Sequence, residues 1–298
     1  MATEKVTVPG VTSPVTDAHV HVQPWGQLLP QAKSLLRAGR ADLEEIDRLF
    51  RDPEAFLEHI EGQGIRRAAL INYVAPEVMG FTEEVNDFIS TFCKGRTDRL
   101  IPFGGVEPRR DKGQVADSMD RIVGDLGIRG IKLHPPHQLY AANAYSNGEV
   151  SGLATVYEKA QEAGIPVMIH TGTSVFPGAR SRLGDPMAAD DIAVDFRDLK
   201  IILAHGGRPI WMETCFFLVR RHPNVYLDIS SLPPKRLLDY FPRLEKIASK
   251  VLFGTDWPAP GVEGIAKNLE EFRALPLGDE AKTEILSRAA ESVFGPAA

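Results

Sequence analysis

Residues 153–172 read LATVYEKAQEAGIPVMIHTG, a helix pattern followed directly by a strand pattern. In the first part, apolar residues recur three or four positions apart, and the pattern ends at Gly164, where glycine commonly terminates a helix. Residues 167–169, VMI, are then continuously apolar, which is typical of a parallel strand buried on both faces. The stretch therefore predicts a helix that returns the chain to a strand ending at His170.

The same alternation continues along the whole chain. Further helix patterns ending at glycine are FLEHIEGQG (56–64), TEEVNDFISTFCKG (82–95) and VADSMDRIVGDLG (115–127). Strand patterns recur at Val15–His21, Arg67–Tyr73, Leu100–Val106, Gly130–His134, Pro166–Gly172, Lys200–Gly206, Val225–Ser231 and Val251–Asp256. Eight such units predict an α/β protein with a single (β/α)8 TIM barrel, residues 1–298 forming one domain. The alternative, an open doubly wound sheet, usually carries G-x-G-x-x-G after its first strand, and HVHVQP stands there instead.

Two connections are longer than simple loops. Gln23–Pro53 follows the first strand, and Thr173–Asp191 follows the fifth and is rich in Gly, Pro, Ser and Arg. Both leave from the carboxyl ends of strands, where barrels build their binding sites. We expect these insertions to form a lid or a wall of the site, with an inert surface insertion as the alternative.

Composition and charge limit the classes of partner that the protein can bind. The chain has 34 Lys+Arg and 40 Asp+Glu, a net charge of −6, and no basic block that would indicate nucleic-acid binding. No apolar run approaches the roughly 20 residues that cross a membrane, and the first residues lack the apolar core of a signal peptide. We therefore expect a cytoplasmic protein with small-molecule partners. The apolar run Trp211–Val219 serves either the helix layer or a homo-oligomer interface.

The residues that suggest chemistry stand at strand ends. His19 and His21 lie two apart in DAHVH, so both imidazoles point to one face and form half of a metal site, with Asp17 as a possible orienting group. Three further residues, His170, His205 and Asp256, end strands five, six and eight and should lie on the same rim. The alternatives are a core role for His205 and a helix cap for Asp256. By contrast, His59 and His222 lie on or beside helices and are expected at the surface or hydrogen-bonded, while His137 is undecided.

Three motifs in order resemble the amidohydrolase superfamily, in particular its branch related to aminocarboxymuconate-semialdehyde decarboxylase and γ-resorcylate decarboxylase. They are D-x-H-x-H at Asp17–His21, H-G-G at residues 205–207, and G-T-D-W-P at residues 254–258. The resemblance covers nearly the whole chain. It implies that His19, His21, His170 and Asp256 ligate one divalent metal ion, most commonly zinc and alternatively manganese. It also implies that His205 acts as an acid or base, with Asp256 relaying a proton of the metal-activated water.

Three other residues are expected to bind substrate. Lys132 and His134 lie two apart at the end of the fourth strand and so share a face. Arg208 follows the H-G-G motif and either pairs with a substrate carboxylate or is a surface arginine at the start of a helix. Lys132 departs from the decarboxylase branch. It is either a cationic anchor for a substrate carboxylate, a carboxylated bridge between two metal ions, or a structural residue, so two ions are expected only if it is carboxylated. Trp25 and Trp257 belong either to the wall of the site or to the core.

The sequence thus leaves several functions open. The main expectation is a metal-dependent hydrolase that acts on a small, carboxylated organic substrate through metal-activated water. The alternative is a metal-dependent non-oxidative decarboxylase of an unsaturated or aromatic carboxylic acid, which uses the same residues. A barrel that binds a metal without catalysis is disfavoured because structural zinc sites prefer four closed ligands, often including Cys.

Overall fold

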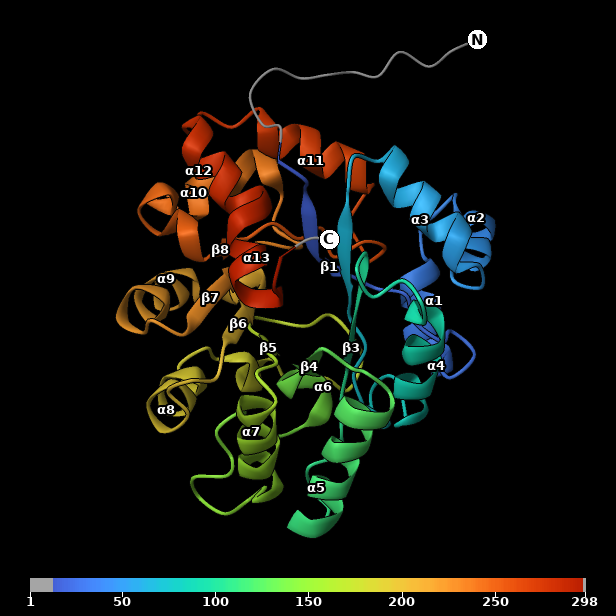
Figure 1. Ribbon diagram of the computed structural model, residues 1–298, viewed down its shortest axis with the longest axis vertical. Coiled ribbons are helices and arrows are strands. Elements are labelled where there is room, and N and C mark those ends of the chain that lie inside the picture. Colours follow the sequence, from blue (N-terminus) through green and yellow to red (C-terminus); the bar gives the residue numbers. More distant parts are fainter. Residues whose placement is uncertain (1–12, 297–298) are drawn as a thin grey trace.

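The computed structural model describes residues 13–296, and its centre is a sheet of eight parallel strands in sequential order (Figure 1). The strands are β1 (Thr16–Val20), β2 (Arg67–Leu70), β3 (Leu100–Gly104), β4 (Gly130–Leu133), β5 (Val167–His170), β6 (Ile201–Ala204), β7 (Val225–Asp228) and β8 (Val251–Leu252). Beyond β8 the chain returns to β1, since the Ala18 N–H donates to the Phe253 carbonyl at 2.8 Å and the Asp256 N–H to the His19 carbonyl at 2.7 Å. The predicted TIM barrel is confirmed, and each strand lies inside its predicted range.

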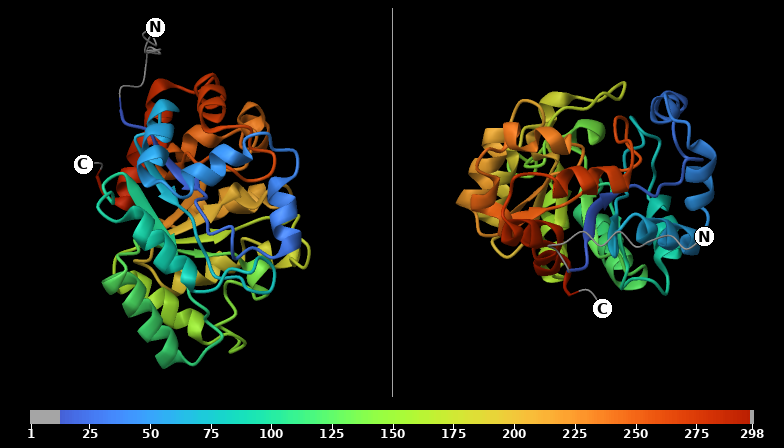
Figure 2. Two further views of the ribbon diagram at one scale, coloured as in Figure 1. Left: turned by 90° about the vertical axis from the view of Figure 1, so that its right-hand side faces the viewer. Right: turned by 90° about the horizontal axis from the view of Figure 1, so that it is seen from above.

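Helices surround the strands on the outside, as Figures 1 and 2 show. They are α1 (Pro30–Arg37), α2 (Leu43–Leu49), α3 (Pro53–Gly62), α4 (Glu84–Cys93), α5 (Lys112–Asp120), α6 (Pro135–Gln138), α7 (Gly152–Glu162), α8 (Ala188–Asp195), α9 (Met212–Arg221), α10 (Leu237–Tyr240), α11 (Ile265–Arg273), α12 (Asp279–Thr283) and α13 (Ala289–Phe294). The insertion after β1 contains α1 and α2, and the one after β5 leads into α8.

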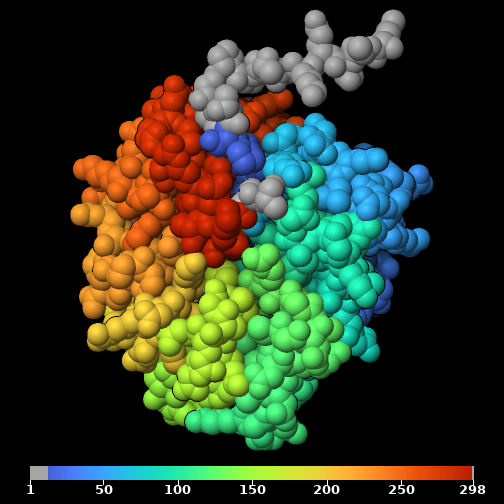
Figure 3. Space-filling model, in the orientation of Figure 1, coloured from blue at the N-terminus to red at the C-terminus, as the bar shows by residue number. Residues whose placement is uncertain are grey.

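Two apolar layers follow from the two-residue period of the strands. On β6, Ile201 and Leu203 pack into the outer core between strands and helices, whereas Ile202 and Ala204 point into the barrel. The inner layer also includes residues of α13, whose Phe294 ring contacts Phe103 of β3 with a centroid separation of 6.0 Å. In Figure 3, α13 appears in red on the visible face. The barrel interior is therefore a packed core, and the opposite end is left for polar groups.

The run Trp211–Val219 serves mainly the helix layer. Most apolar residues of α9, including Cys215, Leu218 and Val219, are buried, and Phe217 is 47% exposed. None of the helices in the described part of the chain has the length and apolar character needed to cross a membrane.

Candidate active site

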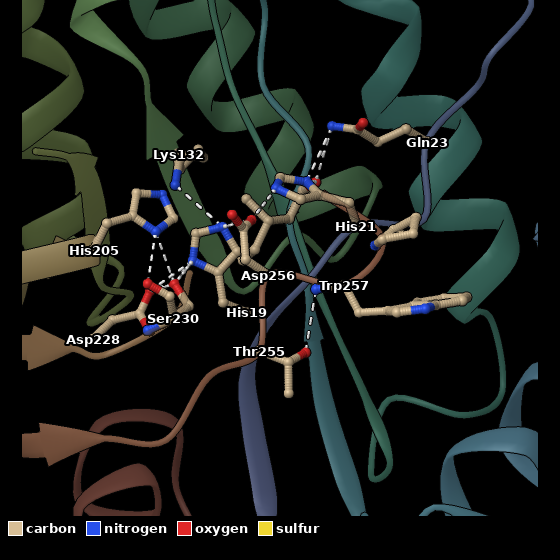
Figure 4. Close-up of polar contacts among 12 residues, drawn as sticks. His19, His21, Gln23, Lys132, His205, Asp228, Ser230, Thr255, Asp256 and Trp257 are labelled. Atoms are coloured by element: carbon tan, nitrogen blue, oxygen red, sulfur yellow. Dashed lines mark hydrogen bonds and ion pairs between the residues drawn. The ribbon is translucent and has the colours of Figure 1, made fainter. Parts of the chain in front are cut away.

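Three buried side chains from distant parts of the sequence converge at the carboxyl ends of the strands. They are His19 on β1, His205 directly after β6 and Asp256 after β8, and one ligand atom from each lies within 4.8 Å of the others. Figure 4 shows these residues turned toward one another. Imidazole nitrogens and a carboxylate are a donor set that suits zinc or manganese. This cluster is a candidate divalent metal site.

His21 joins the cluster through Asp256. Its Nε2 lies 3.0 Å from Asp256 Oδ1, and its Nδ1 lies 2.9 Å from the carbonyl oxygen of Ile71. The carbonyl only accepts hydrogen bonds, so a proton on Nδ1 satisfies this shorter contact and leaves the lone pair of Nε2 facing the carboxylate; the side-chain amide nitrogen of Gln23 also lies 3.1 Å from Nδ1. The Nε2 of His19 also approaches this carboxylate, at 3.4 Å from Oδ1. Two nitrogens and an anionic oxygen at such distances fit a shared cation between them.

His170, at the end of β5, lies beside this cluster. Its ring centroid is 4.8 Å from that of His205, and its Nε2 lies 3.3 Å from the Thr173 carbonyl oxygen. Its Nδ1 is buried and has no hydrogen-bond partner among residues 13–296. A buried nitrogen whose lone pair has no hydrogen-bond donor or metal ion is energetically costly. His170 is therefore also suited to be a metal ligand.

Burial sets the charge state of these groups. Desolvation holds the pKa of His19, His170 and His205 well below the usual histidine value, so the imidazoles are neutral near pH 7. Burial alone would raise the pKa of Asp256, but the contacts with the rings of His21 and His19 and the charge of Arg208 hold it below its usual value. Neutral imidazoles and an ionised carboxylate are the forms that bind a metal ion.

The backbone at this rim is strained. Among the described residues other than glycine, four have positive φ, and three of these lie at the site: His205 (65°), Ser231 (59°) and Asp256 (68°). Such conformations cost on the order of 1–3 kcal/mol each and persist only where the surrounding structure enforces them. Their clustering at one end of the barrel supports a functional role for that end.

A pocket of about 200 Å³ opens above these residues. Both insertions contribute to it, as expected, the first through residues such as Trp25 and Leu36, and the second through residues such as Ser174 and Phe176. Its lining comprises His21, Gln23, Trp25, Leu36, Tyr73, Met79, Lys132, His134, His137, His170, Thr173, Ser174, Val175, Phe176, His205, Arg208, Ser231, Asp256, Pro258, Ala259 and Pro260.

Two cations face this pocket, whereas Asp256 is the one acidic residue among the described residues that line it. The Nζ of Lys132 lies 3.5 Å from His19 Nε2, and burial lowers the pKa of this ammonium group to about 8. Arg208 is partly exposed, and its Nε is buried without a hydrogen-bond partner in the described chain. The positive charges favour an anionic ligand.

Stacked rings form one side of the pocket. The ring of His134 lies between those of His137 and His170, with centroid separations of 3.4 and 3.8 Å, and Tyr73 stacks on it at 5.2 Å. His137 also contacts the Tyr73 hydroxyl through Nδ1 at 3.0 Å and the Ser174 hydroxyl through Nε2 at 2.7 Å. The role of His137 was not predicted, because the HPPHQ segment has no clear strand or helix period that would orient its side chain.

The structure corrects the expectation for Asp17. Its carboxylate accepts hydrogen bonds from the Thr255 N–H and hydroxyl and from the His19 N–H, and so joins β1 to the chain after β8 rather than orienting an imidazole. Asp228, at the end of β7, occupies the orienting position instead, with Oδ2 2.6 Å from His19 Nδ1. The sequence carried a signal for it, since VYLD ends a strand with a carboxylate on the same rim as His205.

The structure also places two tryptophans and a histidine whose roles the sequence left open. Trp25 lines the pocket, whereas Trp257 is buried and packs against Phe50 and His59. His222 pairs with Asp190: the Nε2 atom of His222 lies 2.6 Å from the Oδ1 atom of Asp190, as expected for a hydrogen-bonded histidine outside the site.

Solved structures share this fold over nearly the whole chain. An uncharacterised TIM-barrel protein from Bordetella bronchiseptica has 22% identity and a TM-score of 0.73, with 94% of this chain and 98% of that chain covered. A 5-carboxyvanillate decarboxylase from Novosphingobium aromaticivorans, complexed with manganese, has 17% identity, 96% coverage of both chains and a TM-score of 0.66. A probable 2-pyrone-4,6-dicarboxylic acid hydrolase from Acinetobacter baumannii has 14% identity, 94% and 99% coverage and a TM-score of 0.61.

Sequence comparison gives the family. No curated protein matches the sequence. The model of the amidohydrolase family matches residues 16–295, which include every strand of the barrel and all the residues of the candidate metal site. The resemblance inferred from the three motifs is thereby confirmed, and the chain is an enzyme that belongs to the amidohydrolase family.

Proposed function

We propose that this enzyme is a metal-dependent, non-oxidative decarboxylase of a flat, unsaturated or aromatic carboxylic acid. The observation that carries the proposal is the pocket itself. Two cations, Lys132 and Arg208, and stacked rings surround a small space above a single carboxylate and the neutral imidazole of His205. Decarboxylases of aromatic carboxylic acids recur among the solved structures with this fold, which supports this choice over the hydrolase expected from the sequence.

The metal ligands in this proposal are His19, His21, His170 and Asp256. Three observations support them: the imidazole nitrogens of His19 and His21 that face the Asp256 carboxylate, the unpartnered Nδ1 of His170, and the burial that lowers the pKa of His19 and His170 and keeps these two rings neutral. Zinc and manganese both suit this donor set. When bound, the ion supplies positive charge that binds and polarises oxygen atoms of the substrate.

Substrate binding falls to the cations and the flat walls. The guanidinium group of Arg208 can form paired hydrogen bonds with a carboxylate, and Lys132 adds a second positive charge next to His19. The ring of the substrate would lie along the stack that includes Tyr73 and His134, with Trp25 and Phe176 from the two insertions completing the enclosure. Enclosure excludes water from the reacting carbon.

Proton transfer falls to His205. Decarboxylation breaks the C–C bond between the substrate carbon and its carboxylate and forms a C–H bond at the same carbon. The carboxylate substrate and one proton are consumed, and the protonated product and carbon dioxide are formed. In its neutral form His205 accepts a proton at Nε2, either from solvent or from a substrate hydroxyl, and delivers it to the carbon that loses the carboxylate. The electron pair of the breaking C–C bond then restores the unsaturated system, and carbon dioxide leaves.

Product analysis separates this proposal from hydrolysis. The purified enzyme, with its metal content measured, is incubated with hydroxylated benzoic acids, methoxylated benzoic acids and pyrone carboxylic acids, and the products are identified by mass spectrometry. Loss of carbon dioxide supports the proposal, whereas a product that has gained water identifies a hydrolase. About two ions per chain would support a carboxylated Lys132 bridge, and about one ion would exclude it.

Two variants test the roles of the histidines. His205→Asn should retain the metal and lose turnover by at least about a hundredfold. Loss of the ion in this variant would instead make His205 a ligand, in line with its place in the cluster with His19 and Asp256. His222→Asn is the control, because it also removes a buried histidine but one that is paired with Asp190 outside the pocket.

A further inference from the structure

A buried carboxylate outside the pocket contacts the candidate metal site from behind. Asp228 ends β7 and is fully buried, and its Oδ2 lies 2.6 Å from His19 Nδ1. A carboxylate accepts hydrogen bonds, so Nδ1 of His19 donates and carries the proton, and an imidazole that binds a metal ion is neutral. The lone pair of His19 therefore resides on Nε2, the nitrogen that faces Asp256 at 3.4 Å.

Ser230 extends this contact to His205. Its hydroxyl donates to Asp228 Oδ2 at 2.8 Å, and its oxygen lies 2.9 Å from His205 Nδ1. Because the hydroxyl proton is directed to the carboxylate, the serine oxygen accepts from His205. The Ser230 carbonyl oxygen lies 3.2 Å from the same nitrogen and can also only accept. Both contacts place the proton of His205 on Nδ1 and leave the lone pair on Nε2.

The surrounding backbone holds Asp228 in this position. Its Oδ1 accepts the Ser230 N–H at 2.8 Å, so both carboxylate oxygens are engaged. A Cβ atom on Gly254 would lie 2.5 Å from Asp228 Oδ1 and 3.0 Å from the Cβ atoms of His19 and Ser230. The glycine of the G-T-D-W-P motif thus provides the space that the carboxylate occupies. Figure 4 shows Asp228 and Ser230 together below the rings of His19 and His205.

We propose that Asp228 and Ser230 are positioning residues that fix the ring tautomers of His19 and His205 through one shared carboxylate oxygen. The arrangement prepares the Nε2 atom of His19 for the metal ion and the Nε2 atom of His205 for proton transfer. A carboxylate behind a metal-binding imidazole orients the ring and increases its basicity. The functional part of the inference rests on the roles proposed above for the two histidines, but the tautomers themselves are a property of the chain alone.

The tautomers can be measured without a substrate. In zinc-loaded enzyme labelled with 15N-histidine, two-dimensional NMR spectra that correlate ring nitrogens with ring carbon-bound protons distinguish protonated from unprotonated nitrogens. His19→Gln and His205→Asn each remove one set of signals and so assign them. We expect the proton on Nδ1 in both rings. A proton on Nε2 of either ring in the wild-type enzyme overturns the proposal, whether or not the enzyme proves to be a decarboxylase.

Substitutions test the consequence of the contacts. Asp228→Asn should weaken zinc binding by about 10–100-fold in a competition titration with a chelator. Ser230→Ala should change the His205 ring signals and lower kcat by about tenfold with little change in KM, and Ser230→Thr, which keeps the hydroxyl, should restore both. Ser287→Ala is the matched control, because it removes a buried hydroxyl at the other end of the barrel, next to Glu291. Unchanged His205 signals in Ser230→Ala, or wild-type zinc affinity in Asp228→Asn, would contradict the proposal.

Discussion

Lys132→Met should make the metal-free protein more stable near neutral pH. Lys132 is 1% exposed, and burial lowers the pKa of its ammonium group from 10.5 to about 8. In the unfolded chain the group keeps its ordinary pKa, so below about pH 8 folding requires a fully charged group to be buried. Since a tenfold change in an equilibrium constant corresponds to about 1.4 kcal/mol, this burial costs about 3 kcal/mol near pH 7. Methionine has a similar length and no charge, and so removes that cost.

The sign of the pH dependence identifies the cause. Between the folded and unfolded pKa values of Lys132 the unfolded chain binds more protons, so the free energy of unfolding of the wild type rises with pH. About 2 kcal/mol of the advantage of Lys132→Met should therefore disappear by about pH 9.5. Urea unfolding of chelator-treated protein at both pH values measures it. Lys33→Met, which removes an exposed lysine on α1, is the control and should show no such difference.

Two results would refute this reasoning. An advantage of Lys132→Met that is the same at both pH values would mean that packing, and not charge, separates the variants. A variant less stable than the wild type near neutral pH would mean that the contacts of Lys132 with His19, and the charge of Asp228 and Asp256, outweigh desolvation. The expected result, greater stability together with lost turnover, would show that the barrel retains a destabilising cation for its chemistry.

Three shorter predictions concern the ion, the substrate anchor and the close packing behind the site. His19→Ala should lack the metal ion when purified without chelator, as measured by elemental analysis; a wild-type metal content would refute the assigned site. Arg208→Met should raise KM by at least about tenfold with a smaller effect on kcat, because a charged hydrogen bond to the substrate carboxylate is lost. Gly254→Ala should lower the free energy of unfolding by about 1–3 kcal/mol in urea titrations, because its Cβ would overlap with Asp228 Oδ1.

The barrel and its rim were predictable because both depend on local patterns. Continuous apolar runs such as VMI and IILA mark strands buried on two faces, and in a barrel of parallel strands all carboxyl ends meet at one end. A histidine directly after such a run, as at His170 and His205, is therefore placed on the rim by its position in the sequence. No knowledge of strand order was needed for this step.

The contacts between rim residues were not predictable in the same way. The period of a strand gives the face to which Asp17 or Asp228 points, but not which neighbour it meets across the barrel. That depends on register, and a displacement of one residue exchanges the faces of a strand. Asp17 thus pairs with Thr255, while Asp228, 209 residues from His19 in the sequence, makes the contact expected of Asp17. His137 was undecided for a different reason, because the four-residue helix α6 that carries it is too short to show a period.

The choice between hydrolysis and decarboxylation depends on the segments that the sequence predicts least well. Both reactions would use the same ion and the same His205, and they differ in which substrate carbon lies against them. That placement is set by Arg208 and by the walls that the two insertions contribute, Trp25 from the first and Phe176 from the second. Exchanging these wall residues while keeping His19, His205 and Asp256 should therefore change the substrate, and even the reaction, without loss of the metal ion, whereas replacing His19 or Asp256 should abolish both metal binding and turnover.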